Sequence, residues 1–165
     1  MIKTAILTMS DKGYIGERKD ITGPTIKNIL PEDTYSLVYY KMLPDEIDKI
    51  TEELVYLCDE LKVNLILTNG GTGFSKRDVT PEATLQVSEK LVPGFGEAMR
   101  AASLKITPKA MLSRGISCIR NETLIINLPG SPKAATENLE VILDAIPHGI
   151  DILTGNATEC ATPKK

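Results

Sequence analysis

The sequence predicts an α/β protein in which helices cover both faces of a mostly parallel sheet. Short runs rich in apolar, β-branched and aromatic residues, such as 4–9, 35–43 and 63–68, have the length and composition of strands. Segments with helical periodicity lie between these runs. Alternation of strand and helix along one chain is typical of the α/β layer architecture. Ligands of such proteins bind where strands end and helices begin.

The first strand, 4–9, leads into the polar loop SDKGYIGERKD, in which two glycines act as loop signals. A helix is expected over 21–30. Thr22 is its predicted N-cap, and Pro24 lies in the first turn, where the missing N–H has no helical partner to lose.

The second strand, 35–43, precedes a helix over 44–61. Asp45 after a proline is the predicted N-cap of this helix, and acidic residues fill its first turn, where the helix dipole favours them. The buried strand 63–68 then runs directly into a group of glycines. The apolar face of the helix repeats every three or four residues and consists of Ile47, Ile50, Leu54, Leu57 and Leu61.

The second half of the chain continues the pattern. A helix is expected from Thr80 to about Lys90, and another over 94–104. Two strand-like runs within 116–128 predict a hairpin. A last amphipathic helix is expected over 133–146, with Leu139, Ile142, Leu143 and Ile146 on its apolar side.

A chain of 165 residues is long enough for one ordinary domain, which we expect over 1–153, followed by a polar tail over 154–165. The net charge of −3 gives no broad surface for nucleic acid. Aromatic residues make up 4% of the chain and Trp is absent, which argues against stacking of single strands. No apolar run is long enough to span a bilayer or to serve as a signal peptide.

The three cysteines, Cys58, Cys118 and Cys160, are far apart and odd in number. This spacing fits neither a disulfide framework nor a CxxC metal site. We therefore expect core or inert thiols in the reduced cytosol, and a cytoplasmic protein.

The stretch TNGGTGFSKRDVTPEAT, residues 68–84, is the strongest candidate for a ligand site. Three glycines within four positions allow positive φ and leave backbone N–H groups bare, so that they can form an anion nest. Thr72 adds a hydroxyl donor, and the helix that begins near Pro81 adds its positive end. The alternative is a tight strand-to-helix turn without a ligand. Neither a Walker A element nor a dinucleotide fingerprint is present, which predicts another kind of phosphate or nucleotide loop.

Asp78 follows the glycines, and a carboxylate beside a phosphate site is repelled unless a cation lies between them. Mg²⁺ suits this position because it takes one or two carboxylates and keeps its other positions for water and phosphate oxygens. The alternatives for Asp78 are a surface pair with Arg77 or a local turn cap. For Asp45 the residues favour a helix N-cap over a metal ligand.

Other polar residues near strand ends are further candidates for ligand contacts. Ser131 in PGSP either caps the following helix or marks a second anion site at its N-terminus. The amide of Asn127 is suited to recognising a polar ring. Arg114, beside Ser113, has the planar donor fork that matches a phosphate. His148 has no His or Cys at ligand spacing and is expected to be structural.

Four separated motifs occur in the chain: TMSDKGYIGERKDITGP, PDE after the second strand, GGTG followed by RDVTPEAT, and MLSRGISCIRNETLIINLPGSPKAATENLEVIL. Together they resemble the MogA/MoaB family of molybdenum-cofactor biosynthesis proteins, in the family's order and up to about residue 153. The SDK loop and the LSRG and PGSPKA segments resemble the MogA branch, the molybdopterin adenylyltransferases, more than the MoaB branch.

The resemblance implies a three-layer α/β/α sandwich and a homotrimer. It implies transfer of AMP from Mg-ATP to the terminal phosphate of molybdopterin with release of pyrophosphate, and a partner insertase of the MoeA type. Asp45 and Asp78 match the family's two functional aspartates, which would act in catalysis and hold Mg²⁺. The residues expected to bind substrates are Ser10, Asp11, Lys12, Gly70, Gly71, Thr72, Gly73, Ser113, Arg114, Asn127, Leu128, Pro129, Gly130 and Ser131.

Two alternatives stay open beside this enzyme. One is a pterin-binding carrier or scaffold of the MoaB type without catalysis. The other is an unrelated nucleotide-dependent enzyme that shares the fold, since a fold by itself does not determine function.

Overall fold

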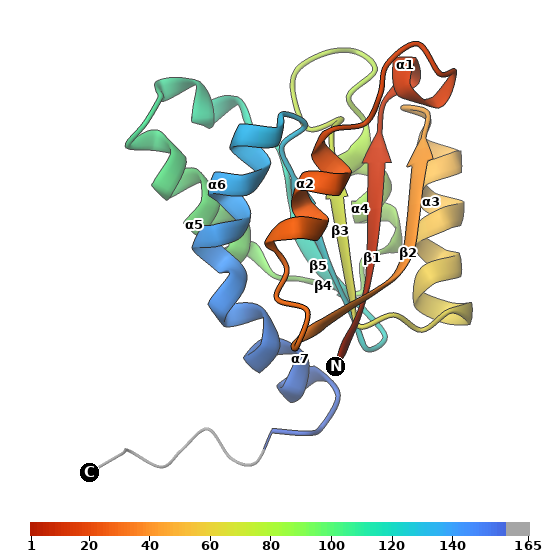
Figure 1. Ribbon diagram of the computed structural model, residues 1–165, viewed down its shortest axis with the longest axis vertical. Helices are drawn as coiled ribbons and strands as arrows, with labels where there is room; N and C mark the ends of the chain where they lie inside the picture. Colours follow the sequence, from red (N-terminus) through yellow and green to blue (C-terminus); the bar gives the residue numbers. More distant parts are fainter. Residues whose placement is uncertain (158–165) are drawn as a thin grey trace.

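A six-stranded sheet forms the centre of the computed structural model, which describes residues 1–157 (Figure 1). The strand order is β2–β1–β3–β6–β5–β4. The first four strands in this order pair in parallel, and β5 and β4 extend the sheet by antiparallel pairing. The mostly parallel sheet and the predicted hairpin are therefore confirmed. The strands are β1 (Ile2–Met9), β2 (Tyr35–Leu43), β3 (Leu65–Asn69), β4 (Lys90–Leu91), β5 (Ser117–Arg120) and β6 (Thr123–Leu128).

Helices cover both faces of this sheet. The α-helices are α1 (Asp11–Tyr14), α2 (Thr22–Ile29), α3 (Ile47–Val55), α4 (Thr80–Val87), α5 (Pro93–Leu104), α6 (Pro132–Ile142) and α7 (Ile146–Leu153). A π-helical turn, Tyr56–Glu60, continues α3, and 3₁₀ turns occupy Pro108–Leu112 and Leu143–Ala145.

Two hydrophobic cores lie on opposite sides of the sheet because successive strand side chains point to opposite faces. In β1, Ile6 packs with residues of α2, α5, α6 and α7, whereas Ala5 and Leu7 pack with residues of α3 and α4. Fully burying one such Leu or Ile contributes about 1.5–3 kcal/mol. The predicted three-layer α/β/α sandwich is confirmed.

Two helix boundaries differ from the sequence predictions. The predicted helix 80–90 ends at Val87, and Lys90 and Leu91 instead pair with β5 as an edge strand. The predicted helix 133–146 breaks after Ile142, and α7 begins four residues later at Ile146. Pro147 explains this second break, because it lacks an N–H and its ring clashes with the carbonyl four residues earlier.

Two predicted N-caps are wrong. Thr22 is the first residue of α2, and its hydroxyl donates to the carbonyl of Gly130 at 2.8 Å. The carboxylate of Asp20 instead accepts from the N–H of Gly23 at 3.0 Å. Asp45 does not cap α3, because Glu46 holds the cap position and no side chain bonds there. The cap by Ser131 is confirmed, since its hydroxyl accepts from the N–H of Ala134 at 3.3 Å.

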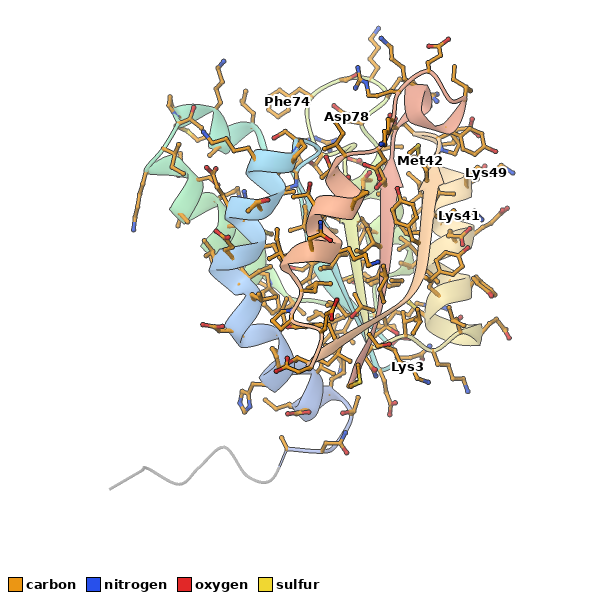
Figure 2. The ribbon with its side chains drawn as sticks, in the orientation of Figure 1. Lys3, Lys41, Met42, Lys49, Phe74 and Asp78 are labelled. Atoms are coloured by element: carbon orange, nitrogen blue, oxygen red, sulfur yellow. The ribbon has the colours of Figure 1, made fainter. Side chains whose placement is uncertain are left out.

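A ligand crevice is expected between β1 and β3. The helix after β1, α2, packs on one face of the sheet, and the helix after β3, α4, packs on the other. The two connections therefore diverge and leave an opening at the carboxyl ends of the strands. Figure 2 shows Asp78 and Met42 at this end of the molecule and Lys3 at the opposite end.

Among the described residues, no helix is both long and apolar enough to cross a membrane. Of the predicted tail, residues 158–165 and with them Cys160 lie outside the described part of the chain.

Candidate functional site

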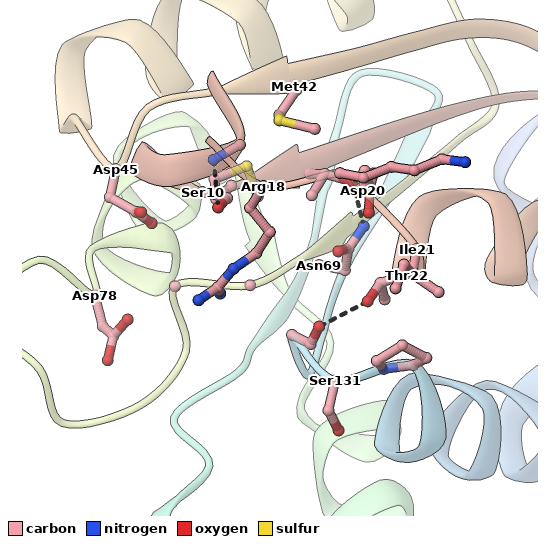
Figure 3. A pocket seen from close by; sticks show the side chains of 18 residues that line it. Ser10, Arg18, Asp20, Ile21, Thr22, Met42, Asp45, Asn69, Asp78 and Ser131 are labelled. Atoms are coloured by element: carbon pink, nitrogen blue, oxygen red, sulfur yellow. Dashed lines mark hydrogen bonds between the residues drawn. The ribbon is translucent and has the colours of Figure 1, made fainter. Parts of the chain in front are cut away.

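A cavity of about 670 Å³ opens at the carboxyl ends of the parallel strands (Figure 3). It lies between the loops that follow β1, β2, β3 and β6, so residues far apart in the sequence meet there. The residues predicted for the site that line it are Ser10, Asp45, Gly70, Gly71, Asp78, Gly130 and Ser131.

The glycine loop has a backbone that other residues cannot follow. Gly70 and Gly71 have φ of 89° and 66°. A Cβ on Gly70 would lie 2.3 Å from the carbonyl oxygen of Met9, and one on Gly71 would lie 2.3 Å from Oγ1 of Thr80. Thr80 holds the loop by donating its hydroxyl to the carbonyl of Gly70 at 2.9 Å. The loop is thus a tight turn, and its backbone lines the cavity without a side chain to cover it.

Asp45 is bound to the neighbouring loop through one carboxylate oxygen only. Its Oδ2 accepts from the N–H of Asp11 at 3.1 Å, and its own N–H donates to Oδ1 of Asp11 at 3.0 Å. Its Oδ1 is buried and has no hydrogen-bond partner among the described residues. Burial raises the pKa of Asp45, and the negative charges of Asp11 and Asp78 act in the same direction. A buried carboxylate oxygen without a donor is suited to a cation.

Asp78 lines the same cavity from the segment between the glycine loop and α4. Its Oδ2 accepts from the N–H of Ser75 at 2.8 Å, so the predicted turn cap is confirmed. A Cβ on Gly73 would lie 2.9 Å from this same oxygen. The predicted surface pair with Arg77 is wrong, because Arg77 donates to both oxygens of Asp11 at 2.8 Å. That hydrogen bond lowers the pKa of Asp11.

Arg114 binds the glycine loop through its carbonyl groups. Its backbone N–H donates to the carbonyl of Thr72 at 2.9 Å, and its Nε donates to the carbonyl of Gly73 at 2.7 Å. Its Nη2 donates to the carbonyl of Asp78 at 2.8 Å, and Nη1 pairs with Glu82. The guanidinium donors are therefore engaged within the protein, and Arg114 shapes the site without lining the cavity.

The other predicted residues lie around the cavity without lining it. Asn127 and Leu128 are buried, and the Asn127 amide donates to the hydroxyls of Thr68 and Thr84 at 2.9 and 3.0 Å. This amide serves the packing between strands and α4 and does not face the cavity. The remaining predicted residues outside the lining are Asp11 and Lys12 in α1, Thr72 and Gly73 in the loop held by Arg114, and Ser113 and Pro129, which line a separate cavity of about 240 Å³.

Among the lining residues that carry a charge or an amide, four were not singled out from the sequence: Arg18, Lys19, Asp20 and Asn69. Figure 3 shows the guanidinium of Arg18 reaching across the mouth of the cavity toward Asp78. Arg18 and Lys19 could have been predicted from the sequence, because two adjacent cations in the loop GERKD suit an anionic ligand. The signal for Asp20 was its place at the start of a predicted helix, and Asn69 lay within the predicted ligand loop 68–84 but was given no role of its own.

His148 and the described cysteines do not line the cavity. His148 lies in α7, which Figure 1 shows at the other end of the sheet from α1. Cys58 and Cys118 are buried and form no disulfide. Burial raises the pKa of the Cys58 thiol to about 12, so the reactive thiolate is disfavoured there.

Residues 5–148 match the family model described as a probable molybdopterin binding domain. The chain belongs to this family. The molybdopterin adenylyltransferase of Helicobacter pylori is 45% identical over 157 residues, which are 94% of this chain and 89% of that protein. The molybdopterin adenylyltransferase of Escherichia coli K12 is 38% identical over 97% of this chain and 89% of its own length.

Solved structures of family members have the same fold. The molybdopterin biosynthesis enzyme MoaB of Thermus thermophilus superposes with a TM-score of 0.90 at 46% identity and covers 94% of this chain and 98% of that one. The molybdopterin biosynthesis Mog protein of Mycobacterium ulcerans has a TM-score of 0.85 at 35% identity, over 93% of this chain and 97% of that one. The family predicted from the motifs is confirmed, and members with both branch names resemble the chain.

Proposed function

We propose that this family member is a molybdopterin adenylyltransferase that takes part in molybdenum-cofactor biosynthesis. The terminal phosphate oxygen of molybdopterin would attack the α-phosphorus of ATP. A new phosphorus–oxygen bond forms, the bond from the α-phosphorus to the bridging oxygen breaks, and pyrophosphate leaves. The observation that supports this most is the buried Oδ1 of Asp45, which has no partner among the described residues and lies beside the glycine loop.

Asp45 and Asp78 are the residues that would hold Mg²⁺. A Cβ on Gly71 would lie 3.0 Å from Oδ1 of Asp45, so any other residue at this position would crowd the oxygen. Among the described residues no group of three or more His, Cys, Asp or Glu side chains is placed to hold a metal. Two carboxylates with phosphate oxygens and water are the usual ligands of Mg²⁺. When bound, the ion supplies positive charge to the triphosphate and the leaving pyrophosphate.

The protein itself positions the two anionic substrates. Gly70 and Gly71 present bare backbone to the cavity, and Arg18 and Lys19 add positive charge to its lining. A cation and oriented N–H groups in a partly enclosed site stabilise the negative charge that develops as pyrophosphate departs. Holding the two substrates in line supplies the rest of the rate enhancement.

The chemistry requires no covalent intermediate on the protein. Neither His nor Cys occurs among the described residues that line the cavity. The attacking phosphate is already ionised near neutral pH, so it needs no strong general base.

The cellular setting follows from the family resemblance. We infer a cytoplasmic homotrimer that passes adenylylated molybdopterin to an insertase of the MoeA type. A second candidate is a molybdopterin-binding carrier without turnover, which the match to a probable molybdopterin binding domain also fits.

A turnover assay separates these two functions. The protein is incubated with molybdopterin, ATP and Mg²⁺, while pyrophosphate release is followed and the pterin is analysed by mass. The enzyme makes an AMP-modified pterin only with the metal, and Asp78→Asn keeps pterin binding but loses turnover. Asp151→Asn, an exposed carboxylate change in α7, is the matched control and stays active. Pterin binding without product in the wild-type protein would support the carrier and reject the enzyme.

A further inference from the structure

A chain of hydrogen bonds fixes the orientation of Asn69 at the end of β3. The Asn69 Nδ2 donates to the carbonyl of Leu7 at 3.3 Å and to Oγ1 of Thr8 at 2.9 Å. Thr8 in turn donates its hydroxyl to Oδ2 of Asp20 at 2.6 Å, and the hydroxyl of Tyr40 donates to the same oxygen. An ionised carboxylate only accepts hydrogen bonds, so the Thr8 proton points at Asp20 and Thr8 accepts from Asn69.

The other end of the Asn69 amide has no partner. Asn69 is 1% exposed, and its Oδ1 forms no hydrogen bond with any described residue. Turning the amide over would not solve this, because Oδ1 would then face the carbonyl of Leu7, which is also an acceptor. The chain through Thr8 and Asp20 therefore keeps an unsatisfied acceptor in the wall of the large cavity.

The position of Asn69 indicates which ligand group this acceptor suits. Asn69 lies directly before Gly70, and Figure 3 shows its carboxamide beside Asp20 and Thr22, away from Asp45 and Asp78. The hydroxyl of Thr22 is engaged by the carbonyl of Gly130, so it does not satisfy Asn69. An ionised phosphate offers only acceptors and would be repelled by Oδ1. A ring N–H, an amino group or a ribose hydroxyl would pair with it.

We propose that Asn69 determines substrate specificity by accepting a hydrogen bond from an N–H or O–H donor of one of the two substrates. Thr8 and Asp20 act as positioning residues that present the Asn69 oxygen to the cavity. The proposal rests on the proposed function for the identity of the substrates. The pterin ring and the ribose of ATP each carry donors of this kind.

Binding measurements test this without requiring turnover. Dissociation constants for molybdopterin and for Mg-ATP are measured separately by calorimetry on wild type and Asn69→Leu, whose side chain has the same branched shape but no acceptor. We expect Asn69→Leu to bind one substrate about tenfold or more weakly than wild type does. The reason is that an unpaired buried polar group strongly favours the ligand that satisfies it. The other substrate binds within about twofold of wild type.

Deoxynucleotides separate the two sources of the donor. If a ribose hydroxyl binds Asn69, either 2′-deoxy-ATP or 3′-deoxy-ATP binds wild type more weakly than ATP does, by a factor similar to the effect of Asn69→Leu. The Asn69→Leu variant then binds that deoxynucleotide and ATP equally well. If the pterin binds Asn69, only the molybdopterin constant changes. Asn138→Leu is the matched control, because Asn138 is buried and hydrogen-bonded but lies outside the large cavity, and it leaves both constants unchanged.

Thr8→Val provides a second variant that keeps the Asn69 oxygen but removes the hydroxyl that orients it. It is expected to weaken the same substrate by a smaller factor, and it decides the question if Asn69→Leu does not fold. Unchanged affinity for both substrates in the folded variants would overturn the proposal. Failure of the proposed function is a separate result, because it appears as wild-type protein that binds both substrates and makes no adenylylated pterin.

Discussion

Asp11 and Asp45 each accept a hydrogen bond from the backbone N–H of the other, at 3.0 and 3.1 Å. The exchange joins the loop after β1 to the loop after β2 and leaves Oδ1 of Asp45 as the unpaired oxygen at the cavity. Arg77 completes the arrangement by binding both oxygens of Asp11. The position of the candidate metal ligand is therefore set by a residue that follows a different strand.

Removing the Asp11 carboxylate should lower turnover more than it lowers stability. In Asp11→Ala the loop that carries Asp45 loses its anchor, and we expect turnover to fall about tenfold, equivalent to about 1.4 kcal/mol of transition-state stabilisation. Asp11→Asn keeps an acceptor for the Asp45 N–H and should retain most activity. Steady-state kinetics of the two variants provide the check. Equal activity of Asp11→Ala and wild type would contradict the positioning role.

Replacing Asp45 by Asn should stabilise the ligand-free protein at neutral pH and remove activity. Burial raises the pKa of Asp45, so the ionised form is disfavoured in the fold. Relief of one buried carboxylate oxygen without a donor is worth about 1–3 kcal/mol, and the gain is reduced here because Asp45 is only half-buried. For a chain of this size each kcal/mol raises Tm by roughly 2–4 °C. Thermal unfolding with EDTA present, paired with the turnover assay, tests both parts.

The gain in Asp45→Asn should disappear at low pH. Because the folded pKa of Asp45 lies above its ordinary value of 3.8, the stability contributed by its protonated form is complete below that value. It is lost as pH rises from 3.8 through the folded pKa, so wild type begins to fall behind the variant in this range and the difference is complete above the folded pKa. The free energies of unfolding of the two proteins, measured from about pH 3 to 7, should differ more as the pH rises. Divergence in the opposite direction would show that the sign of the pKa shift is wrong.

Gly71→Ala should destabilise the protein and disrupt the loop. The residue has φ of 66°, and the new Cβ would lie 2.3 Å from Oγ1 of Thr80, so strain of about 1–3 kcal/mol or more is expected. Gly94→Ala is the matched control in α5, because its Cβ would meet nothing within 4 Å. Alanine is favoured over glycine by up to about 1 kcal/mol in a helix interior. Denaturant unfolding should therefore move the two variants in opposite directions or leave Gly94→Ala unchanged.

Arg114→Met should raise KM for the substrates, since Arg114 holds the carbonyls of Gly73 and Asp78. Arg114→Lys should behave like Arg114→Met, because an ammonium cannot reproduce the planar fork. The control is Arg120→Met, which removes an ion pair with Asp59. That pair lies outside the cavity lining, so the control should change stability but not KM. A KM effect of equal size in both variants would reject a specific role for Arg114.

Arg18→Gln should weaken binding of the anionic substrates without changing stability. Arg18 is exposed at the cavity mouth, and an exposed cation acts through a field that salt screens over about 10 Å at 0.1 M. The difference in Kd between wild type and Arg18→Gln should therefore shrink as salt concentration rises. Lys27→Gln, in α2 and exposed, serves as the control for net charge. A salt-independent difference would assign Arg18 a short-range contact instead.

Local sequence patterns determined the elements of this fold. Strand composition, helical periodicity and turn residues depend on neighbours a few positions away, so β1, β3 and α6 were located from their own residues. The glycines of the loop were informative for the same reason, since the positive φ at Gly70 and Gly71 is a local requirement. The motifs in their order also sufficed to identify the family.

Only the tertiary structure decided what the polar side chains bind. Asp45 has the local features of a helix cap, but its partner is Asp11, 34 residues away. Arg114 binds a loop 41 residues earlier, and Asn69 is oriented by a residue 61 positions before it. These partners depend on which strand ends lie side by side, and that is fixed by burial of the two apolar cores on opposite faces of the sheet. Hydrogen bonds of this kind therefore follow from the packed sheet, and the local sequence pattern does not contain them.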